Sequence, residues 1–336
     1  MPKSAQQRLI AKLPKVELHI HIEGSLEPEQ VFTFAERNHV ALPYANIEAL
    51  RAAYSFADLQ SFLDLYYATT HVLQTEQDFY ELALAYGHRA ARDNVRHAEI
   101  FFDPQSHTVR GVPMAHVIGG LRRGLQQAEQ DVGITASLIL CFLRHLSEAQ
   151  AHETLAAAMP FRDAFIGVGL DSAERDNPPE KFARVFAQAR KAGLHVVAHA
   201  GEEGPPAYIR QAIDLLKVER IDHGVRCIED PTLVQELAQK GIPLTVCPLS
   251  NAKLQVTPDL TQHPLKELLE AGVRVTVNAD DPAYFGGTIC DNYEAIATAL
   301  NLHDQQLIAL AQHAIDASFL PLGRRQALTK ELNAVS

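Results

Sequence analysis

The sequence predicts a (β/α)8 barrel, the TIM-barrel fold, as a single domain over residues 1–336. Apolar runs typical of strands buried on both faces alternate with amphipathic segments typical of helices, which favours a parallel sheet with helices outside it. A chain of 336 residues is long for an ordinary domain but usual for such a barrel. Polar residues also follow several of the apolar runs, at the edge where these barrels carry their active sites.

The barrel strands are expected where the apolar runs occur. The runs lie near residues 15–22, 96–103, 135–142, 165–171, 194–199, 220–223, 243–247 and 273–279. Amphipathic segments that should form outer helices separate them, and four of these segments begin at a proline, whose missing N–H suits a first helical turn. These four span residues 179–191, 205–217, 231–239 and 264–271.

A helical insertion is expected after the first strand, over residues 26–92, where the alternation breaks. An apolar face at helical spacing runs through it, formed by Phe56, Leu59, Phe62, Leu63 and Tyr66. This face either packs on the barrel, as amphipathic helices commonly do, or forms a lid over a flat aromatic substrate. Residues 290–336 should form closing helices, and no composition shift suggests a linker to a second domain.

The first expected strand ends in two histidines separated by one residue, His19 and His21. Residues i and i+2 of a strand point to the same face, so both imidazoles can reach one point just past the strand's end, where Gly24 follows. Imidazole is a good ligand for zinc and other borderline divalent metals. Chance histidines on a half-exposed strand are the alternative, and it weakens because later strands end in matching chemistry.

Two further strands end in a histidine followed closely by a glycine. His199 is placed as a third nitrogen ligand rather than a hydrogen-bonded core histidine, and Glu202 on the loop above it can move a proton. His223 ends the next strand, either as a fourth nitrogen ligand or as a base that holds an attacking hydroxide. Asp222 is either its hydrogen-bonded partner or a loop charge.

The last expected strand ends in adjacent carboxylates, Asp280 and Asp281. Adjacent acids that cannot both relax into water repel each other, so a cation or a hydrogen-bond donor should compensate them. A solvated Asp-Asp-Pro turn is the alternative. Because so apolar a strand precedes them, we favour the functional interpretation, in which Asp280 joins the histidines as a metal ligand.

The joint pattern is similar to that of the metal-dependent amidohydrolase superfamily, and within it resembles the adenosine/adenine deaminase family. Five blocks carry the resemblance in chain order, namely Leu18–Gly24, His199–Glu202, Glu219–Gly224, Cys247–Asn251 and Asn278–Pro282. The resemblance extends from about residue 8 to about residue 325, nearly the whole chain. It implies a metal-dependent hydrolase on the barrel that the periodicity predicts.

The resemblance also implies roles for the candidate residues. One Zn²⁺ per chain is expected, although Fe²⁺ accepts similar ligands. Its ligands would be His19, His21, His199 and Asp280. The implied reaction is hydrolytic deamination of a 6-aminopurine, with hydroxide as the nucleophile at C6. Glu202 would protonate the ring nitrogen next to C6, His223 would orient the hydroxide, and Asp281 would hydrogen-bond the nitrogen of the five-membered ring.

Departures from the adenosine-acting pattern place the chain closest to the adenine deaminase subgroup. The first block carries Glu23 in place of Asp, so a longer acid would fill space that a ribose would occupy. The segments Phe101–Gln105 and Leu170–Asp176 also match the adenine pattern. The resemblance therefore implies conversion of adenine to hypoxanthine and ammonia, as in purine salvage, with adenosine or another 6-substituted purine as the alternative substrate.

Residues around the end of the fourth strand are expected to contact the substrate. Glu174 is the candidate acceptor for the N–H that adenine carries where adenosine carries its sugar, because the adenosine enzymes have a small residue there. Ser172 is the reserve candidate, and Gly169 is placed among the substrate-binding residues as well.

Composition and charge argue against other functions and partners. A net charge of −11 does not suit a nucleic-acid surface, and neither a membrane span nor a signal peptide is visible, so a cytoplasmic location is expected. The four cysteines lack paired metal spacing and should be reduced thiols. The expected partner is a small purine base, and no feature indicates an oligomeric state.

Two other classes of function are alternatives. A barrel of this type could be a purine-binding protein without activity, but all the expected metal and acid residues are present. The zinc site of cytidine deaminases needs a Pro-Cys-X-X-Cys run, which this chain lacks.

Overall fold

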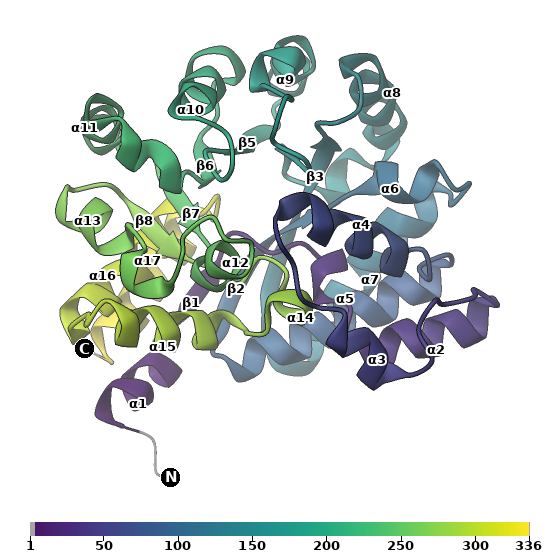
Figure 1. The fold of residues 1–336 in the computed structure, drawn as a ribbon, viewed down its shortest axis with the longest axis horizontal. Coiled ribbons are helices and arrows are strands. Elements are labelled where there is room, and N and C mark those ends of the chain that lie inside the picture. The colour runs from purple at the N-terminus through teal and green to yellow at the C-terminus, as the bar shows by residue number, and fades with distance from the viewer. Residues whose placement is uncertain (1–3, 336) are drawn as a thin grey trace.

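Eight parallel strands, paired in chain order from β1 to β8, form a barrel with helices around it in the computed structural model, which describes residues 4–335 (Figure 1). The strands are β1 (Lys15–Glu17), β2 (Val95–Phe102), β3 (Thr135–Leu143), β4 (Gly167–Asp171), β5 (His195–Ala200), β6 (Arg220–His223), β7 (Leu244–Val246) and β8 (Val275–Val277). The predicted (β/α)8 barrel is confirmed, and each strand falls on the apolar run that predicted it.

The barrel closes between its first and last strands at the level of the predicted metal ligands. The backbone N–H of His21 donates to the carbonyl of Asp280 at 3.0 Å, and the N–H of Asp280 donates to the carbonyl of His19 at 3.1 Å. β1 is shorter than the expected strand over 15–22, because beyond Glu17 the chain forms only single bridges, from Ile20 to Asp280 and from His21 to Phe101. The closure itself therefore holds His19, His21 and Asp280 side by side.

Helices cover the outside of the barrel between successive strands (Figure 1). They include α7 (Met114–Val132), α8 (Glu148–Ala158), α9 (Ala183–Lys191), α10 (Pro206–Gln211), α11 (Pro231–Lys240) and α13 (Leu265–Glu270). The proline-led segments are helical as expected, although 179–182 is a 3-10 turn before α9 and 212–216 is a π-helical turn after α10. No helix within residues 4–335 combines the length and apolarity that a membrane crossing needs.

The closing and connecting helices complete the outer layer. After β8 come α14 (Pro282–Phe285), α15 (Ile289–Ala299), α16 (Asp304–Ala317) and α17 (Leu322–Asn333), while α1 (Ala5–Lys12) precedes β1. Short helices α6 (Pro104–Thr108) and α12 (Pro248–Lys253) follow β2 and β7, each beginning at a proline. The region expected as closing helices, 290–336, is helical over most of its described length.

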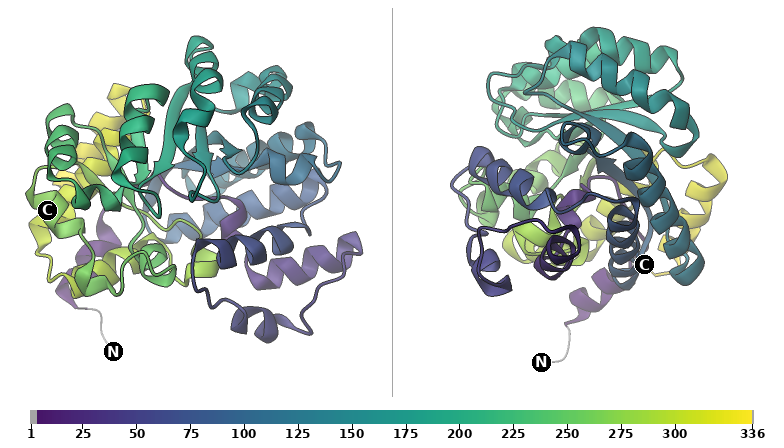
Figure 2. Two further views of the ribbon diagram at one scale, coloured as in Figure 1. Left: turned by 45° about the horizontal axis from the view of Figure 1, so that its top comes forward. Right: turned by 90° about the vertical axis from the view of Figure 1, so that its right-hand side faces the viewer.

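The insertion after β1 divides into two parts. It holds α2 (Pro28–Asn38), α3 (Ile47–Ala52), α4 (Leu59–Thr70) and α5 (Glu76–Arg92), of which the first three lie together at one side of the barrel (Figure 2). α5 packs closely on α7, since a Cβ at Gly120 would lie 2.3 Å from the carbonyl oxygen of Glu76. This fourth helix therefore belongs to the barrel's outer layer, and α4 is the segment that reaches the barrel mouth.

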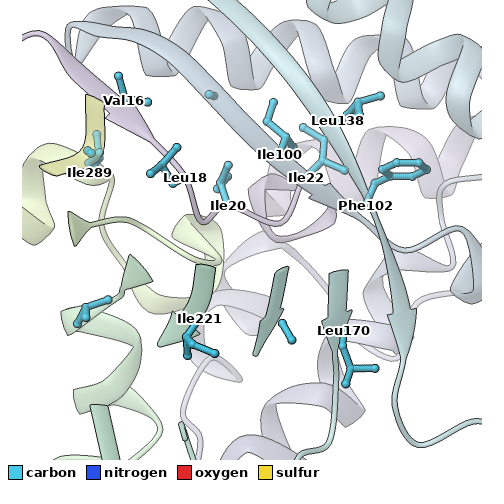
Figure 3. Packing of buried hydrophobic residues seen from close by; sticks show 14 of the residues in the cluster. Val16, Leu18, Ile20, Ile22, Ile100, Phe102, Leu138, Leu170, Ile221 and Ile289 are labelled. Atoms are coloured by element: carbon cyan, nitrogen blue, oxygen red, sulfur yellow. The ribbon is translucent and has the colours of Figure 1, made fainter. Parts of the chain in front are cut away.

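Side chains alternate along the strands, so that one set points outward to the helices and the other points into the barrel below the metal ligands. Val16, Leu18, Ile100, Phe102 and Leu138 are buried between the strands and the helices (Figure 3). A second, smaller cluster fills the barrel interior and contains Phe101, Ile139, Cys141 and Val197. The ring of Phe101 packs 5.1 Å from the rings of both His19 and His21, so the barrel core supports the predicted metal ligands from below.

Candidate metal centre and active site

Three histidines and one aspartate meet at the carboxyl end of the barrel. One ligand atom from each of His19, His21, His199 and Asp280 lies within 4.8 Å of the others, and all four residues are buried. Nε2 of His19 lies 3.2 Å from Oδ1 of Asp280, and Nε2 of His21 lies 3.2 Å from Nε2 of His199. The structure thus brings together all four residues that the sequence pointed to as metal ligands.

Hydrogen bonds to the far side of the rings orient these histidines. Nδ1 of His19 lies 3.1 Å from the carbonyl oxygen and 3.0 Å from Oγ1 of Thr245, which leaves Nε2 facing Asp280. The Thr245 hydroxyl also donates to Asp222, whose second oxygen lies 3.7 Å from Nδ1 of His199. Asp222 is therefore a buried partner of the His199 side of the site and not a solvated loop charge.

Protonation states in this cluster suit a bound divalent cation. Burial lowers the pKa of His21 to about 4 and, together with the charge of neighbouring histidines, lowers the pKa of His199 well below its usual range. Burial would raise the pKa of Asp280, but the charge of His19 holds it well below the usual value, and Asp280 in turn raises the pKa of His19 against the effect of burial. Neutral His21 and His199 and an ionised carboxylate are ligands that zinc binds, and a bound cation would take the place of the proton on His19.

The surroundings of Nε2 of His19 indicate whether a metal ion fits between the four residues. Its Nε2 lies 3.2 Å from Oδ1 of Asp280 without the geometry of a hydrogen bond in the described structure, and buried polar atoms in that state are uncommon. Three nitrogens and one carboxylate oxygen form a donor set of the kind that catalytic zinc sites use, with a position left for water. The residues present therefore fit a divalent metal ion.

Backbone strain marks the same strand ends. His223 has φ 61° and Asp280 has φ 64°, both in the left-handed region that non-glycine residues seldom occupy. Such conformations cost about 1–3 kcal/mol each and persist where surrounding contacts enforce them, commonly at functional sites. The closing hydrogen bonds to His19 and His21 provide that enforcement for Asp280.

Glu202 and His223 face the same point as the ligand cluster. Nε2 of His223 lies 3.5 Å from Oε1 of Glu202 and 3.8 Å from Oδ2 of Asp280. Burial, followed by the charge of Asp280, raises the pKa of Glu202 well above its usual range, which favours the protonated side chain. Burial lowers the pKa of His223 to about 3, which leaves its imidazole neutral.

Two residues that the motif analysis gave no role support His223. Nδ2 of Asn251 lies 3.3 Å from Nδ1 of His223, and Oδ1 of Asn251 lies 3.2 Å from Nε2 of His263. All three side chains are buried, so this chain of contacts fixes the His223 ring. Asn251 lies in a motif block, which was a usable signal, whereas His263 lies outside every block.

The structure gives Glu174 a different place from the one expected. Its Oε1 accepts from the N–H of Gly201 at 2.7 Å, and its Oε2 accepts from Glu202, Glu203 and Gly204 at 3.0, 2.8 and 2.8 Å. It is buried and is absent from the pocket lining. This geometry does not support the expectation that Glu174 binds the substrate, because four backbone donors occupy its carboxylate, which anchors the loop that carries Glu202.

The other candidate substrate contacts have distinct surroundings. Ser172 lines the pocket, with its Oγ accepting from the Tyr67 hydroxyl at 2.9 Å and lying 2.8 Å from Nδ1 of His145. Gly169 lies within β4 outside the pocket lining, where a Cβ would lie 2.5 Å from Sγ of Cys141. Gly169 is therefore a packing position in the barrel wall, not a substrate contact.

Glu23 also differs from its expected role as a filler of the ribose space. It is fully buried and does not line the pocket. Its Oε1 accepts from the backbone N–H of Asp103 at 3.1 Å and lies 2.9 Å from Nε2 of His107. Glu23 therefore positions the segment that follows β2, and it acts on the pocket through Asp103.

The pocket above the ligand cluster has acidic walls and an apolar cover. Asp103, Asp171 and Asp281 line it beside the metal ligands, and Leu59, Phe62, Leu63 and Tyr66 of α4 cover it with Phe285. The cavity is about 30 Å³ in volume. That is far below the roughly 300–1,000 Å³ of typical ligand pockets, so part of the pocket wall has to shift to admit a ligand, and α4 supplies most of its apolar cover.

Burial governs the protonation of these pocket acids. It raises the pKa of Asp281 well above the usual range, and the adjacent charge of Asp280 adds to the shift. It also raises the pKa of Asp103 well above the usual range and the pKa of Asp171 to about 7. The site can therefore hold exchangeable protons on carboxyl groups around a metal-activated nucleophile, which is the chemistry of a hydrolase.

Comparison with known proteins agrees with this chemistry. Residues 14–335 match the family model described as adenosine deaminase. An adenine deaminase from Cupriavidus metallidurans is 62% identical over 312 residues, covering 93% of this chain and 88% of that protein. The crystal structure of an adenine deaminase from Arthrobacter aurescens matches with a TM-score of 0.94 and 50% identity, covering 96% of this chain and 98% of that one.

A zinc-containing relative is also similar in structure. An amidohydrolase from Burkholderia ambifaria, solved with bound zinc, matches with a TM-score of 0.91 and 29% identity. The match covers 100% of this chain and 95% of that chain.

Proposed function

The chain belongs to the adenosine deaminase family, and from that premise we propose that it catalyses the hydrolytic deamination of adenine to hypoxanthine and ammonia. The observation that carries the proposal is the meeting of four metal-ligating residues with Glu202 and His223 in one enclosed pocket. Relatives named adenine deaminase, 58–62% identical over nearly the whole chain, support adenine as the substrate.

We assign the metal site to zinc, held by His19, His21, His199 and Asp280. When bound, zinc lowers the pKa of water to about 7 and supplies hydroxide at neutral pH. The zinc found in the Burkholderia ambifaria amidohydrolase supports this choice over iron. Elemental analysis of enzyme purified without added metal tests it, and one zinc per chain is the expected result.

The chain's own residues divide the remaining work. Glu202, protonated in its buried position, donates its proton to the ring nitrogen next to C6, which makes that carbon electrophilic. Neutral His223, held by Asn251, accepts a hydrogen bond from the attacking oxygen and orients it. Protonated Asp281 donates to the nitrogen of the five-membered ring, so the purine is fixed along the edge that carries the amino group.

The experiment that tests this function compares two substrates. The zinc-loaded enzyme should release ammonia from adenine, with a kcat/KM at least about 10³-fold higher than for adenosine, on the scale of a missing hydrogen-bond partner in a tight site. Equal turnover of adenosine would refute the assignment to adenine, and absence of turnover with either compound would refute the deaminase function.

A further inference from the structure

Two pocket carboxylates are neither among the four proposed metal ligands nor part of the proposed proton transfers. Asp103 follows β2 and Asp171 ends β4, and both are only 2% exposed. Each offers an oxygen within 4.8 Å of the other and of a ring nitrogen of His21. Both line the pocket, so two buried acids point into the space that the substrate would occupy.

Donors from other residues are scarce around this pair. Oδ1 of Asp103 and both carboxylate oxygens of Asp171 accept no well-formed hydrogen bond from the rest of the described structure, and Nδ1 of His21 lies 3.6 Å from Oδ2 of Asp171. The neighbours that favour an ionised Asp171 are Asp103, through a side-chain hydrogen bond, the weakly donating Cys141 thiol and the Arg144 guanidinium. Two guanidinium nitrogens of Arg144 donate to the carbonyl oxygens of Asn177 and His199, and its Nη2 has no partner in the described structure. Buried acceptors without donors are costly, so a ligand should supply them.

The backbone at Asp103 is held firmly in this place. Its N–H donates to the buried carboxylate of Glu23, and its carbonyl accepts from both the N–H and the hydroxyl of Ser106. Asp171 is equally fixed, because its carbonyl accepts from the N–H of Arg144 at 3.0 Å. The unpartnered acceptors therefore sit on a rigid frame, as a preorganised binding site requires.

The order of strands in the barrel decides which edge of a purine would face the pair. Glu202 follows β5 and Asp281 follows β8, and in the proposed function they bind the nitrogens on either side of the carbon that carries the amino group. Asp103 and Asp171 come from β2 and β4, on the remaining arc of the barrel. The opposite purine edge, with N3 and N9, must therefore face Asp103 and Asp171.

We propose that Asp103 and Asp171 form the subsite that selects a free purine base, by accepting a hydrogen bond from its N9–H. A nucleoside carries a sugar at N9, so it offers no donor there and leaves the buried oxygens unpartnered while its sugar meets them. This inference rests on the proposed function, since it takes the orientation of the purine from it. The sequence suggested Glu174 as the acceptor for this N–H, and the inference assigns that role to Asp103 and Asp171, which line the pocket.

The test compares adenine with 9-methyladenine, which keeps the reacting edge but lacks the N9–H. Asp103→Ala and Asp171→Ala should each lower kcat/KM for adenine by about 5- to 150-fold, the usual cost of leaving a buried donor without its partner. The loss should appear mainly in KM. Turnover of 9-methyladenine should change by less than about threefold, so that the preference for adenine narrows.

Two kinds of control separate this subsite from other roles. Asp64→Asn makes the same kind of substitution on the exposed face of α4 and should leave kcat/KM for both substrates unchanged. Asp103→Asn and Asp171→Asn keep an acceptor oxygen and should retain part of the lost activity. Because the Asn variants are isosteric, they also serve if the Ala variants fail to fold, which thermal unfolding would reveal.

Several results would overturn the inference. An equal fall with both substrates, or loss of zinc together with activity, would mean that the pair supports His21 rather than the purine. Two metal ions per wild-type chain would make Asp103 and Asp171 ligands of a second cation. Wild-type turnover of 9-methyladenine within about tenfold of adenine would also refute it. If the zinc-loaded wild type deaminates no adenine, the proposed function fails first, and the inference falls with it.

Discussion

Both ends of the barrel bury ionisable side chains, but within the described residues only at the amino end of the strands is a buried acid paired with an arginine. Away from the site, toward the amino ends of the strands, Glu99 of β2 and Arg220 of β6 form a fully buried ion pair. The N–H of Phe319 also donates to the Glu99 carboxylate, at 2.5 Å. Burial would raise the pKa of Glu99, but Arg220 holds it at about 2. We call these two residues the amino-end pair.

At the carboxyl end, four buried acids form no ion pair with a Lys or Arg of residues 4–335. Burial raises the pKa of Asp103, Asp171, Glu202 and Asp281 above their usual range. We call these residues the carboxyl-end acids. The contrast matches the division of labour in barrels of this kind, in which one end stabilises the fold and the other carries the chemistry. It predicts that substitutions at the two ends will separate stability from activity.

The largest effect on activity should come from the metal ligands beside the carboxyl-end acids. His19→Ala or Asp280→Ala should lose most of the bound metal and nearly all activity together, because each removes one of four ligands and leaves the others misaligned. Zinc content by elemental analysis and ammonia release measure the two losses on one sample. Full activity with substoichiometric metal would contradict this site.

The next largest loss of activity is expected when Glu202, one of the carboxyl-end acids, can no longer donate a proton. Glu202→Gln should keep the metal but lower kcat by about 10²–10⁴-fold, the contribution typical of a positioned acid. Glu203→Gln is the matched control, because its side chain pairs with Arg175 and does not line the pocket. A fall of less than about tenfold for Glu202→Gln would mean that another group carries the proton.

A smaller loss is expected from the residue that positions Glu202. Glu174→Gln removes the charge and one acceptor oxygen from a site that holds four backbone N–H groups, so the loop over 201–204 should loosen. We expect kcat to fall by roughly 10- to 100-fold, the scale of a catalytic group displaced by about 1 Å, with KM changed little. A change in KM alone would return Glu174 to the substrate-binding role that the structure denies it.

The features that the sequence predicts well are those that recur at each strand of the barrel. Strand positions and metal ligands are visible because apolar runs end in His or Asp, and a parallel barrel brings all strand ends to one edge. β1 is shorter than its apolar run because residues near Ile20 bridge two neighbouring strands at once, and only closure of the barrel reveals this.

The contacts that could not be predicted from the sequence are those made with backbone groups or with residues distant along the chain. Glu174 binds four N–H groups of a distant loop, and no side-chain pattern encodes such donors. His263, which contacts Asn251, lies outside every motif block. Asp103 and Asp171 become a pair only because β2 and β4 lie on the same arc of the barrel.

The amino-end pair should show the opposite behaviour from the carboxyl-end acids. Arg220→Leu leaves Glu99 buried without its cation, and breaking such a pair typically costs about 3–5 kcal/mol of unfolding free energy. Because neither residue lines the pocket, kcat/KM for adenine should stay within about threefold of the wild type wherever the variant is folded. Urea unfolding and steady-state kinetics at pH 7 measure the two quantities.

The pH dependence of that loss identifies its cause. In the wild type, the depressed pKa of Glu99 contributes stability that is present above the unfolded carboxyl value of about 4.3 and is lost as the pH falls toward about 2. In Arg220→Leu the buried carboxyl is no longer held ionised, so it takes up a proton at higher pH than in the unfolded chain. The deficit in unfolding free energy should therefore be largest near pH 7 and should shrink toward pH 4. A deficit that is the same at both pH values would assign the loss to packing around Phe319, over whose ring the guanidinium lies at 4.4 Å, and not to the ion pair.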